Sequence, residues 1–141
     1  MPRPLTIEDR LAMADLAARY AAAVDQRAFD QLRDVFTTDC QLDTGRSIRD
    51  GTDKVIEAMQ GLLRYEATSH LVGQQVLTPV DDGVVDGLTY CTAHHLFDHG
   101  DHRTDTVMHI HYHDRFVAVG DGWRVATRRL EVLWTDEQPV N

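Results

Sequence analysis

Apolar residues follow a helical spacing in the first half of this chain. They recur every three to four residues at Ile7, Leu11, Ala14, Ala18 and Ala21, which predicts a helix over about residues 7–24. Thr6 and Asp9 are spaced as a capping box at its start. The same spacing predicts two further helices, which carry Phe29, Leu32, Val35 and Phe36 in one and Val55, Ile56, Met59, Leu62 and Leu63 in the other.

Short polar segments are expected to separate these helices. Thr52 is expected to cap the third helix at its N-terminus. Residues 41–50 contain Gly45 among scattered polar residues and suit a brief hairpin.

The second half of the chain changes to a pattern typical of strands. Four segments rich in β-branched and aromatic residues are separated by DDG, DHGDHR and GDG, and they cover residues 69–80, 84–97, 105–119 and 123–134. Helices followed by hairpin-linked strands predict an α+β fold, with the helices packed on a curved antiparallel sheet. Gly73 and Gly87 are expected to mark bends, and residues 136–141 to form a frayed tail of a single domain over residues 1–141.

Alternation along the strands predicts which side chains face the interior. In the third strand one face carries Met108, Ile110, Tyr112 and Phe116, and the other carries His109, His111, His113 and Arg115. The first set is expected to face inward. In the last strand the inward set is expected to be Ala126, Leu130, Val132 and Trp134. Arg128 has the same parity, and a buried guanidinium needs an anion or a hydrogen-bonding cavity.

Composition and charge exclude several classes of partner. The 141 residues include 23 acidic and 14 basic side chains, which gives a formal net charge of −9. We therefore expect no nucleic acid or anionic membrane as a partner. No segment has the pattern of a secretion signal or a membrane span, so a cytoplasmic protein is expected. Cys40 and Cys91 lack metal-site or disulfide-scaffold spacing and are expected to be reduced.

A carboxylate and two imidazoles are candidates for proton-transfer chemistry. Asp25 follows directly on the first helix, in the segment YAAAVD that begins at Tyr20. A carboxylate can orient an imidazole and raise its basicity, and His70 and His95 are the candidate partners. The alternatives are that Asp25 is solvated and that His70 is a structural histidine. Parity places His95 on the inward face of its strand.

Other cofactor-dependent and covalent chemistries lack support in the sequence. His109, His111 and His113 share a face that is expected to point outward, without an HExxH motif, so no metal is expected. There is no GxGxxG, no P-loop and no GxSxG motif, which argues against nucleotide binding and serine hydrolysis.

Three segments resemble the SnoaL-like branch of the nuclear transport factor 2-like superfamily, over about residues 6–135. They are YAAAVDQRAFDQLRDVF, TSHLVGQQ and DGWRVATRRLEVLW. The branch includes scytalone dehydratase, lindane dehydrochlorinase and bile-acid 7α-dehydratase. The resemblance implies catalytic roles for Asp25, His70, Tyr20, His95 and Arg128. Val24 and Thr44 stand where scytalone dehydratase has two tyrosines that reach its substrate carbonyl through water, which implies a different substrate.

The resemblance also implies a cone-like α+β barrel around an apolar pocket. Its expected lining is Leu16, Tyr20, Phe36, Met59, Leu63, Met108, Ile110, Tyr112, Leu130 and Val132. A small hydrophobic substrate and a homodimer or homotrimer are expected, with no cofactor.

The function expected from these observations is a cofactor-independent lyase or isomerase that acts on a cyclic or polyketide-like carbonyl compound. Asp25 would orient His70 as the base, and Tyr20 or His95 would supply the acid. One alternative is a SnoaL-type polyketide cyclase. The other is a non-catalytic protein, either a small-ligand binder or an accessory subunit.

Overall fold

Two α-helices, two short 3₁₀ helices and one six-stranded sheet make up the computed structural model, which describes residues 1–141. In chain order the elements are α1 (Ile7–Asp25), η1 (Phe29–Asp34), β1 (Phe36–Asp43), β2 (Ile48–Asp50), α2 (Thr52–Met59), η2 (Gln60–Arg64), β3 (Ala67–Asp81), β4 (Val84–Asp98), β5 (Arg103–Val119) and β6 (Gly122–Val140).

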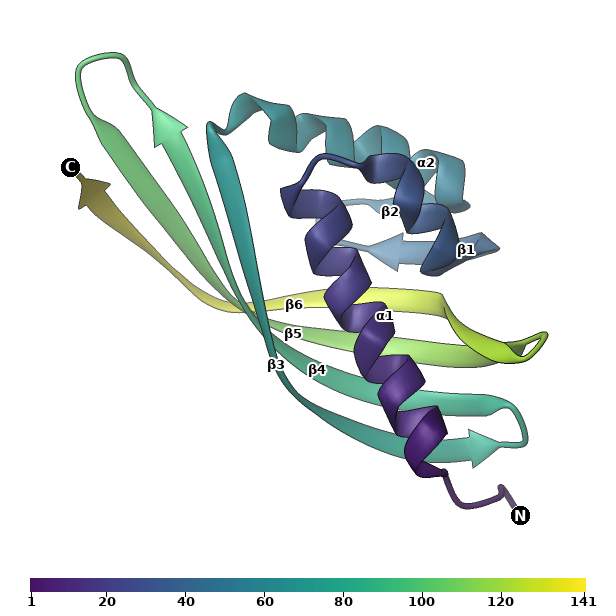
Figure 1. Cartoon of the computed structure of the whole chain (residues 1–141). Helices are drawn as coiled ribbons and strands as arrows, with labels where there is room; N and C mark the ends of the chain where they lie inside the picture. Colours follow the sequence, from purple (N-terminus) through teal and green to yellow (C-terminus); the bar gives the residue numbers. More distant parts are fainter.

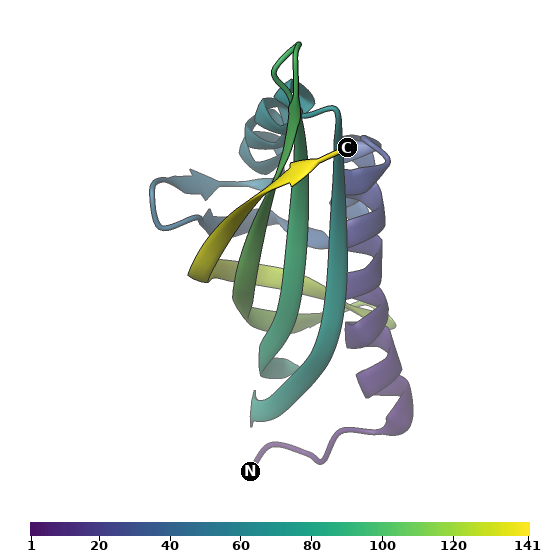
Figure 2. The same cartoon turned by 90° about the vertical axis from the view of Figure 1, so that its left-hand side faces the viewer.

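The sheet is mixed, strongly bent and open. Its strand order is β2-β1-β6-β5-β4-β3, and all neighbours are antiparallel except β1 and β6. The four long strands bend across their middle, and α1 crosses the concave side of the sheet (Figure 1). The view turned by 90° shows the helices gathered on that side, with the outer face of the long strands uncovered (Figure 2). The predicted α+β class and curved sheet are confirmed, but β2 and β3 remain free edges and the barrel does not close.

The N-terminus of α1 is fixed by its capping residues and by the sheet. The predicted capping box is present, since Thr6 Oγ1 accepts from the Asp9 backbone N–H at 3.0 Å and Asp9 Oδ2 accepts from the Thr6 N–H at 2.9 Å. Trp123 Nε1 of β6 donates to Asp9 Oδ1 at 3.1 Å. The face of the helix that is buried against the sheet includes Met13, Leu16 and Tyr20, with small alanines between them. Of the residues whose spacing predicted the helix, only Ala21 is buried, and the others are exposed.

The two other predicted helices are shorter than expected. The second is only a 3₁₀ helix that ends at Asp34, because Phe36 already pairs with Val125 of β6. The third divides into α2 and η2 at Gln60. Gly51 occupies its N-cap position, whereas Thr52 is buried as the first helical residue and its hydroxyl donates to the Thr37 carbonyl at 2.6 Å. The hairpin predicted for residues 41–50 is confirmed by the pairing of β1 and β2.

Two irregularities in β6 change which of its side chains face inward. The register with β5 shifts between Val125 and Thr127 and again between Val132 and Trp134. Ala126 is therefore an extra residue rather than part of the core, and Val125 is fully buried. Trp134, expected inside, is 55% exposed on the outer face, where its ring stacks on His109 at 4.1 Å. Each extra residue reverses the parity that alternation assumes.

The last residues of the chain were expected to fray, but they continue β6. Residues 136–140 pair with β5 as far as Val140 opposite Arg103. The β4–β5 hairpin extends far enough to give them a partner strand.

No helix in the structure has the length and apolar character needed to cross a membrane.

Gly87 provides a test of the packing inside the bent sheet. A Cβ at this position would lie 2.5 Å from Cε2 of Phe116, a ring that is only 1% exposed and cannot move aside freely. We expect Gly87→Ala to lower the free energy of unfolding by roughly 1–3 kcal/mol because it overpacks the core. The measurement is denaturant-induced unfolding followed by circular dichroism.

The matched control for this substitution is Gly61→Ala. Gly61 lies in η2 with no heavy atom within 4 Å of an added Cβ. Its replacement is expected to leave stability unchanged or to raise it slightly. Equal effects at both positions would contradict the assignment of Gly87 as a close-packing position.

Candidate active site

The end of α1 is joined to the start of β3 by the carboxylate of Asp25. This carboxylate accepts three hydrogen bonds, from His70 Nδ1 at 2.7 Å, from the His70 backbone N–H at 2.7 Å and from Thr68 Oγ1 at 2.9 Å. An ionised carboxylate can only accept, so the imidazole proton lies on Nδ1 and the other ring nitrogen, Nε2, is left as a base. The structure thus brings the predicted partners Asp25 and His70 into contact.

The His70 side chain, which is 6% exposed, forms part of the wall of a cavity of about 570 Å³. The cavity lies between the bent sheet, the α2–η2 segment and the β1–β2 loop. Tyr20 and His95 also line it. Apolar residues supply most of the remaining wall, which makes the cavity suitable for a small molecule with a largely hydrophobic surface.

Seven of the ten residues expected to line the pocket do so. They are Tyr20, Met59, Met108, Ile110, Tyr112, Leu130 and Val132. Leu16 and Phe36 lie instead in the core, and Leu63 is 46% exposed outside the cavity. Nine lining residues were not expected from the sequence. Some belong to the β1–β2 loop and to the connection before β3, whose positions no periodicity indicates, and the others belong to helices and strands; the nine are Leu42, Thr44, Gly45, Arg46, Ala58, Leu62, Arg64, Tyr65 and Thr135.

Charge is distributed unevenly around this cavity. Its wall contains Arg46 and Arg64, both of them exposed, and no aspartate or glutamate, although the chain carries 23 acidic residues. Asp25 contacts His70 but is not part of the wall. A neutral or negatively charged ligand therefore fits the wall better than a cation does.

Arg128 lies outside the cavity and has a buried partner that the sequence did not identify. Its Nε and Nη2 donate to the two carboxylate oxygens of Asp114, each at 2.8 Å. The guanidinium also lies over the rings of Tyr20 at 4.4 Å and Tyr112 at 3.9 Å. Burial alone would lower the pKa of Arg128, but the charge and hydrogen bonds of Asp114 outweigh it and raise that pKa. Arg128 thus packs against two residues of the cavity wall, Tyr20 and Tyr112, without lining the cavity itself.

Tyr20 and His95 both have their rings close to that of His70. The ring of Tyr20 is 6.3 Å from that of His70, and the ring of His95 is 5.9 Å from it. Burial raises the pKa of Tyr20, so the phenol keeps its proton at neutral pH. Burial lowers the pKa of His95, whose Nδ1 lies 3.0 Å from the Thr106 carbonyl. His95 is therefore neutral at pH 7, with the proton on Nδ1 donated to that carbonyl.

Comparison with known proteins identifies a family for almost the whole chain. The family model for the SnoaL-like domain matches residues 5–129. An uncharacterized protein of Mycobacterium tuberculosis is 33% identical over 129 residues, which cover 89% of this chain and 85% of that protein.

Solved structures share the same fold. A protein from Kribbella flavida superimposes with a TM-score of 0.84 at 23% identity, over 92% of this chain and 93% of that one. A protein from Novosphingobium aromaticivorans, provisionally named a scytalone dehydratase, gives 0.84 at 20% identity over 96% and 91% of the two chains. A hexachlorocyclohexane dehydrochlorinase from Novosphingobium barchaimii gives 0.82 at 15% identity over 95% and 91%. At these identities the likeness establishes the nuclear transport factor 2-like fold.

The pair formed by Arg128 and Asp114 gives a test of stability. Arg128→Met leaves the carboxylate of Asp114 buried without its partner, so we expect the free energy of unfolding to fall by about 3–5 kcal/mol. The double variant Arg128→Met with Asp114→Leu removes both charges and is expected to regain most of that loss. Denaturant unfolding of the two variants measures both effects. A double variant as unstable as the single one would show that the buried charge is not the cause.

Proposed function

Because the chain belongs to the SnoaL-like family, we propose that it is a cofactor-independent lyase or isomerase of the dehydratase type. The observation that carries the proposal is the contact of Asp25 with His70 at the wall of a largely apolar cavity. The similarity in fold to a dehydrochlorinase and to a provisionally named dehydratase supports the same class of reaction. A non-catalytic ligand binder has no need of a base and a group that orients it.

His70 is the proposed general base. Its Nε2 would remove a proton from a carbon next to a carbonyl group, and the charged imidazolium so formed would be stabilised by Asp25. The same carboxylate fixes the ring through Nδ1 and fixes the backbone through the amide N–H. The base is therefore held in one orientation before a substrate binds.

Tyr20 is the better candidate for the acid. It is protonated at neutral pH, whereas His95 is neutral and its one proton is donated to the Thr106 carbonyl. Tyr20 can therefore donate to a leaving hydroxyl or to a developing enolate. Arg128, 4.4 Å from the Tyr20 ring, would stabilise the phenolate that this step leaves behind. The phenolate could then take a proton back from the imidazolium to complete the cycle.

The cavity favours a cyclic or polyketide-like carbonyl compound as the substrate. Its volume of about 570 Å³ and its mainly apolar wall suit a molecule of one or a few rings. Because the wall includes no acidic side chain, the substrate is proposed to be neutral or acidic.

The roles of Asp25 and His70 are tested by turnover. With a panel of cyclic and polyketide-like hydroxyketones, His70→Ala and Asp25→Asn are each expected to lose at least about a hundredfold in kcat, because the oriented base is lost. Mass spectrometry of the products provides the readout, since dehydration removes one water and cyclisation by aldol addition conserves mass. Near-normal turnover in either variant would refute the assignment.

The chain offers a matched control for these substitutions. His94 Nδ1 lies 2.6 Å from Asp105 Oδ2 in a second histidine–carboxylate pair, and neither residue lines the cavity. His94→Ala is expected to keep normal turnover. Tyr20→Phe is expected to lose about tenfold or more, and His95→Gln less than that. Binding without turnover of any panel compound by the wild type would instead favour the non-catalytic alternative.

We further propose that the chain forms a homodimer or homotrimer. Large apolar side chains are exposed on the outer face of the long strands, where Leu71 is 70%, Trp134 55% and Leu133 45% exposed. Burying them between copies would be favourable. Light scattering is expected to give two or three times the chain mass of 16.0 kDa, and Trp134→Glu is expected to shift the population toward monomer. A monomeric wild type at micromolar concentration would contradict this proposal.

A further inference from the structure

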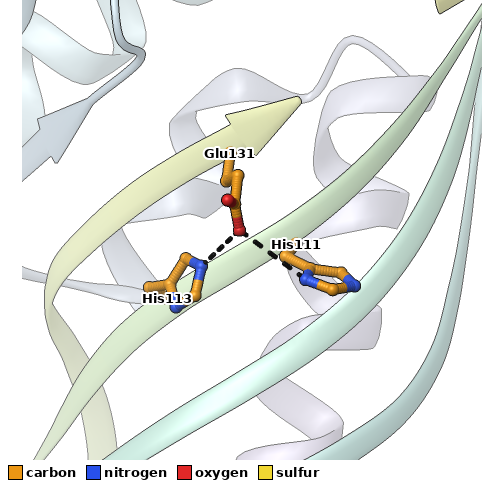
Figure 3. A group of neighbouring side chains, drawn as sticks. All are labelled: His111, His113 and Glu131. Atoms are coloured by element: carbon orange, nitrogen blue, oxygen red, sulfur yellow. Dashed lines mark hydrogen bonds and ion pairs between the residues drawn. The ribbon is translucent and has the colours of Figure 1, made fainter. Parts of the chain in front are cut away.

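Two histidines and a glutamate gather on the outer face of the sheet, away from the cavity. His111 and His113 are two residues apart on β5, and Glu131 lies directly opposite His111 on β6. Figure 3 shows the three side chains turned toward one another across the two strands. The sequence places the histidines on one face but gives no sign that a carboxylate of the next strand joins them.

The distances among the three groups fit a shared ion. Glu131 Oε1 is 2.9 Å from His113 Nε2 and 3.7 Å from His111 Nδ1, and the three ligand atoms all lie within 4.8 Å of one another. A tetrahedral ion about 2.0–2.1 Å from each ligand needs its ligands roughly 3.3 Å apart. The two distances to Glu131 lie on either side of that value, and rotations of the side chains would have to bring all three ligand atoms to it from separations of at most 4.8 Å.

The groups also have suitable chemistry and accessibility. Side-chain exposures of 20% for His111, 36% for His113 and 43% for Glu131 leave room for an ion and for water to complete its coordination. The ring of Tyr90 packs 4.3 Å from that of His111 and restricts its orientation.

We propose that His111, His113 and Glu131 form a binding site for a divalent transition-metal ion, for which Zn²⁺ is the probe. Two imidazoles and one carboxylate are a ligand set that Zn²⁺ accepts, with water in the fourth position. The ion would link β5 to β6 directly behind Ile110, Tyr112 and Leu130, which line the cavity. This site is independent of the proposed reaction.

Direct titration of the tag-free protein with Zn²⁺ tests the site. Calorimetry is expected to show one site per chain in the wild type, and His111→Gln and Glu131→Gln are each expected to weaken binding at least about tenfold because each removes a ligand. Zn²⁺ at about a hundred times its wild-type Kd is expected to raise the thermal midpoint by roughly 5 °C or more in the wild type and by clearly less in His111→Gln and Glu131→Gln. Co²⁺ in place of Zn²⁺ is expected to give an absorption band in the visible range.

Two further variants separate this site from general binding to surface histidines. His109 lies on the same strand face near Asp136, at 3.5 Å, and His109→Gln is expected to bind Zn²⁺ like the wild type. Arg129 lies opposite His113 on β6, and Arg129→Gln removes its positive charge and is expected to bind at least as tightly as the wild type. Absence of binding by the wild type would overturn the proposal. Equal losses in His109→Gln and His111→Gln would do so as well.

Discussion

The three hydrogen bonds accepted by Asp25 are the interaction on which the candidate active site depends. They join the last residue of α1 to the first residues of β3, two elements far apart in the sequence. A carboxylate at a helix C-terminus is unfavourable for the helix dipole, and these hydrogen bonds offset that cost. A residue that is poor for its local structure but well satisfied by distant groups is often retained for chemistry.

Arg128 and Asp114 place a second constraint on the same region. Their buried charges compensate each other, and the guanidinium is enclosed by the rings of Tyr20 and Tyr112. This arrangement connects α1 to the centre of β5 and β6 through one cation. The Tyr20 ring is therefore held by the sheet as well as by its own helix.

The parts of the structure that the sequence predicted are those with a regular local signal. The capping box at Thr6 and the helix over α1 follow from residue spacing, and the four long strands follow from their β-branched and aromatic residues and the turns between them. Residue types made His70 one candidate partner of Asp25, and the family resemblance singled it out. The wrong predictions concern positions where the regular alternation of a strand is interrupted and pairs of residues on different strands. An extra residue near Ala126 and another near Leu133 reverse the alternation in β6, so Trp134 was expected on the wrong face. Asp114 could not be assigned to Arg128, nor Glu131 to His111, because cross-strand register is not visible in a single sequence.

The open sheet has a consequence for the solution behaviour of the chain. As an edge strand, β3 has a partner strand on one side only, and apart from the His70 N–H, which donates to Asp25, the free side can recruit a strand from another molecule into an intermolecular sheet. Two irregularities interrupt it, one between Val72 and Gln75 and one between Pro79 and Asp81, and Pro79 has no N–H to offer. The edge is therefore a poor template for aggregation, and the chain can keep its sheet unclosed without another element to cover that side.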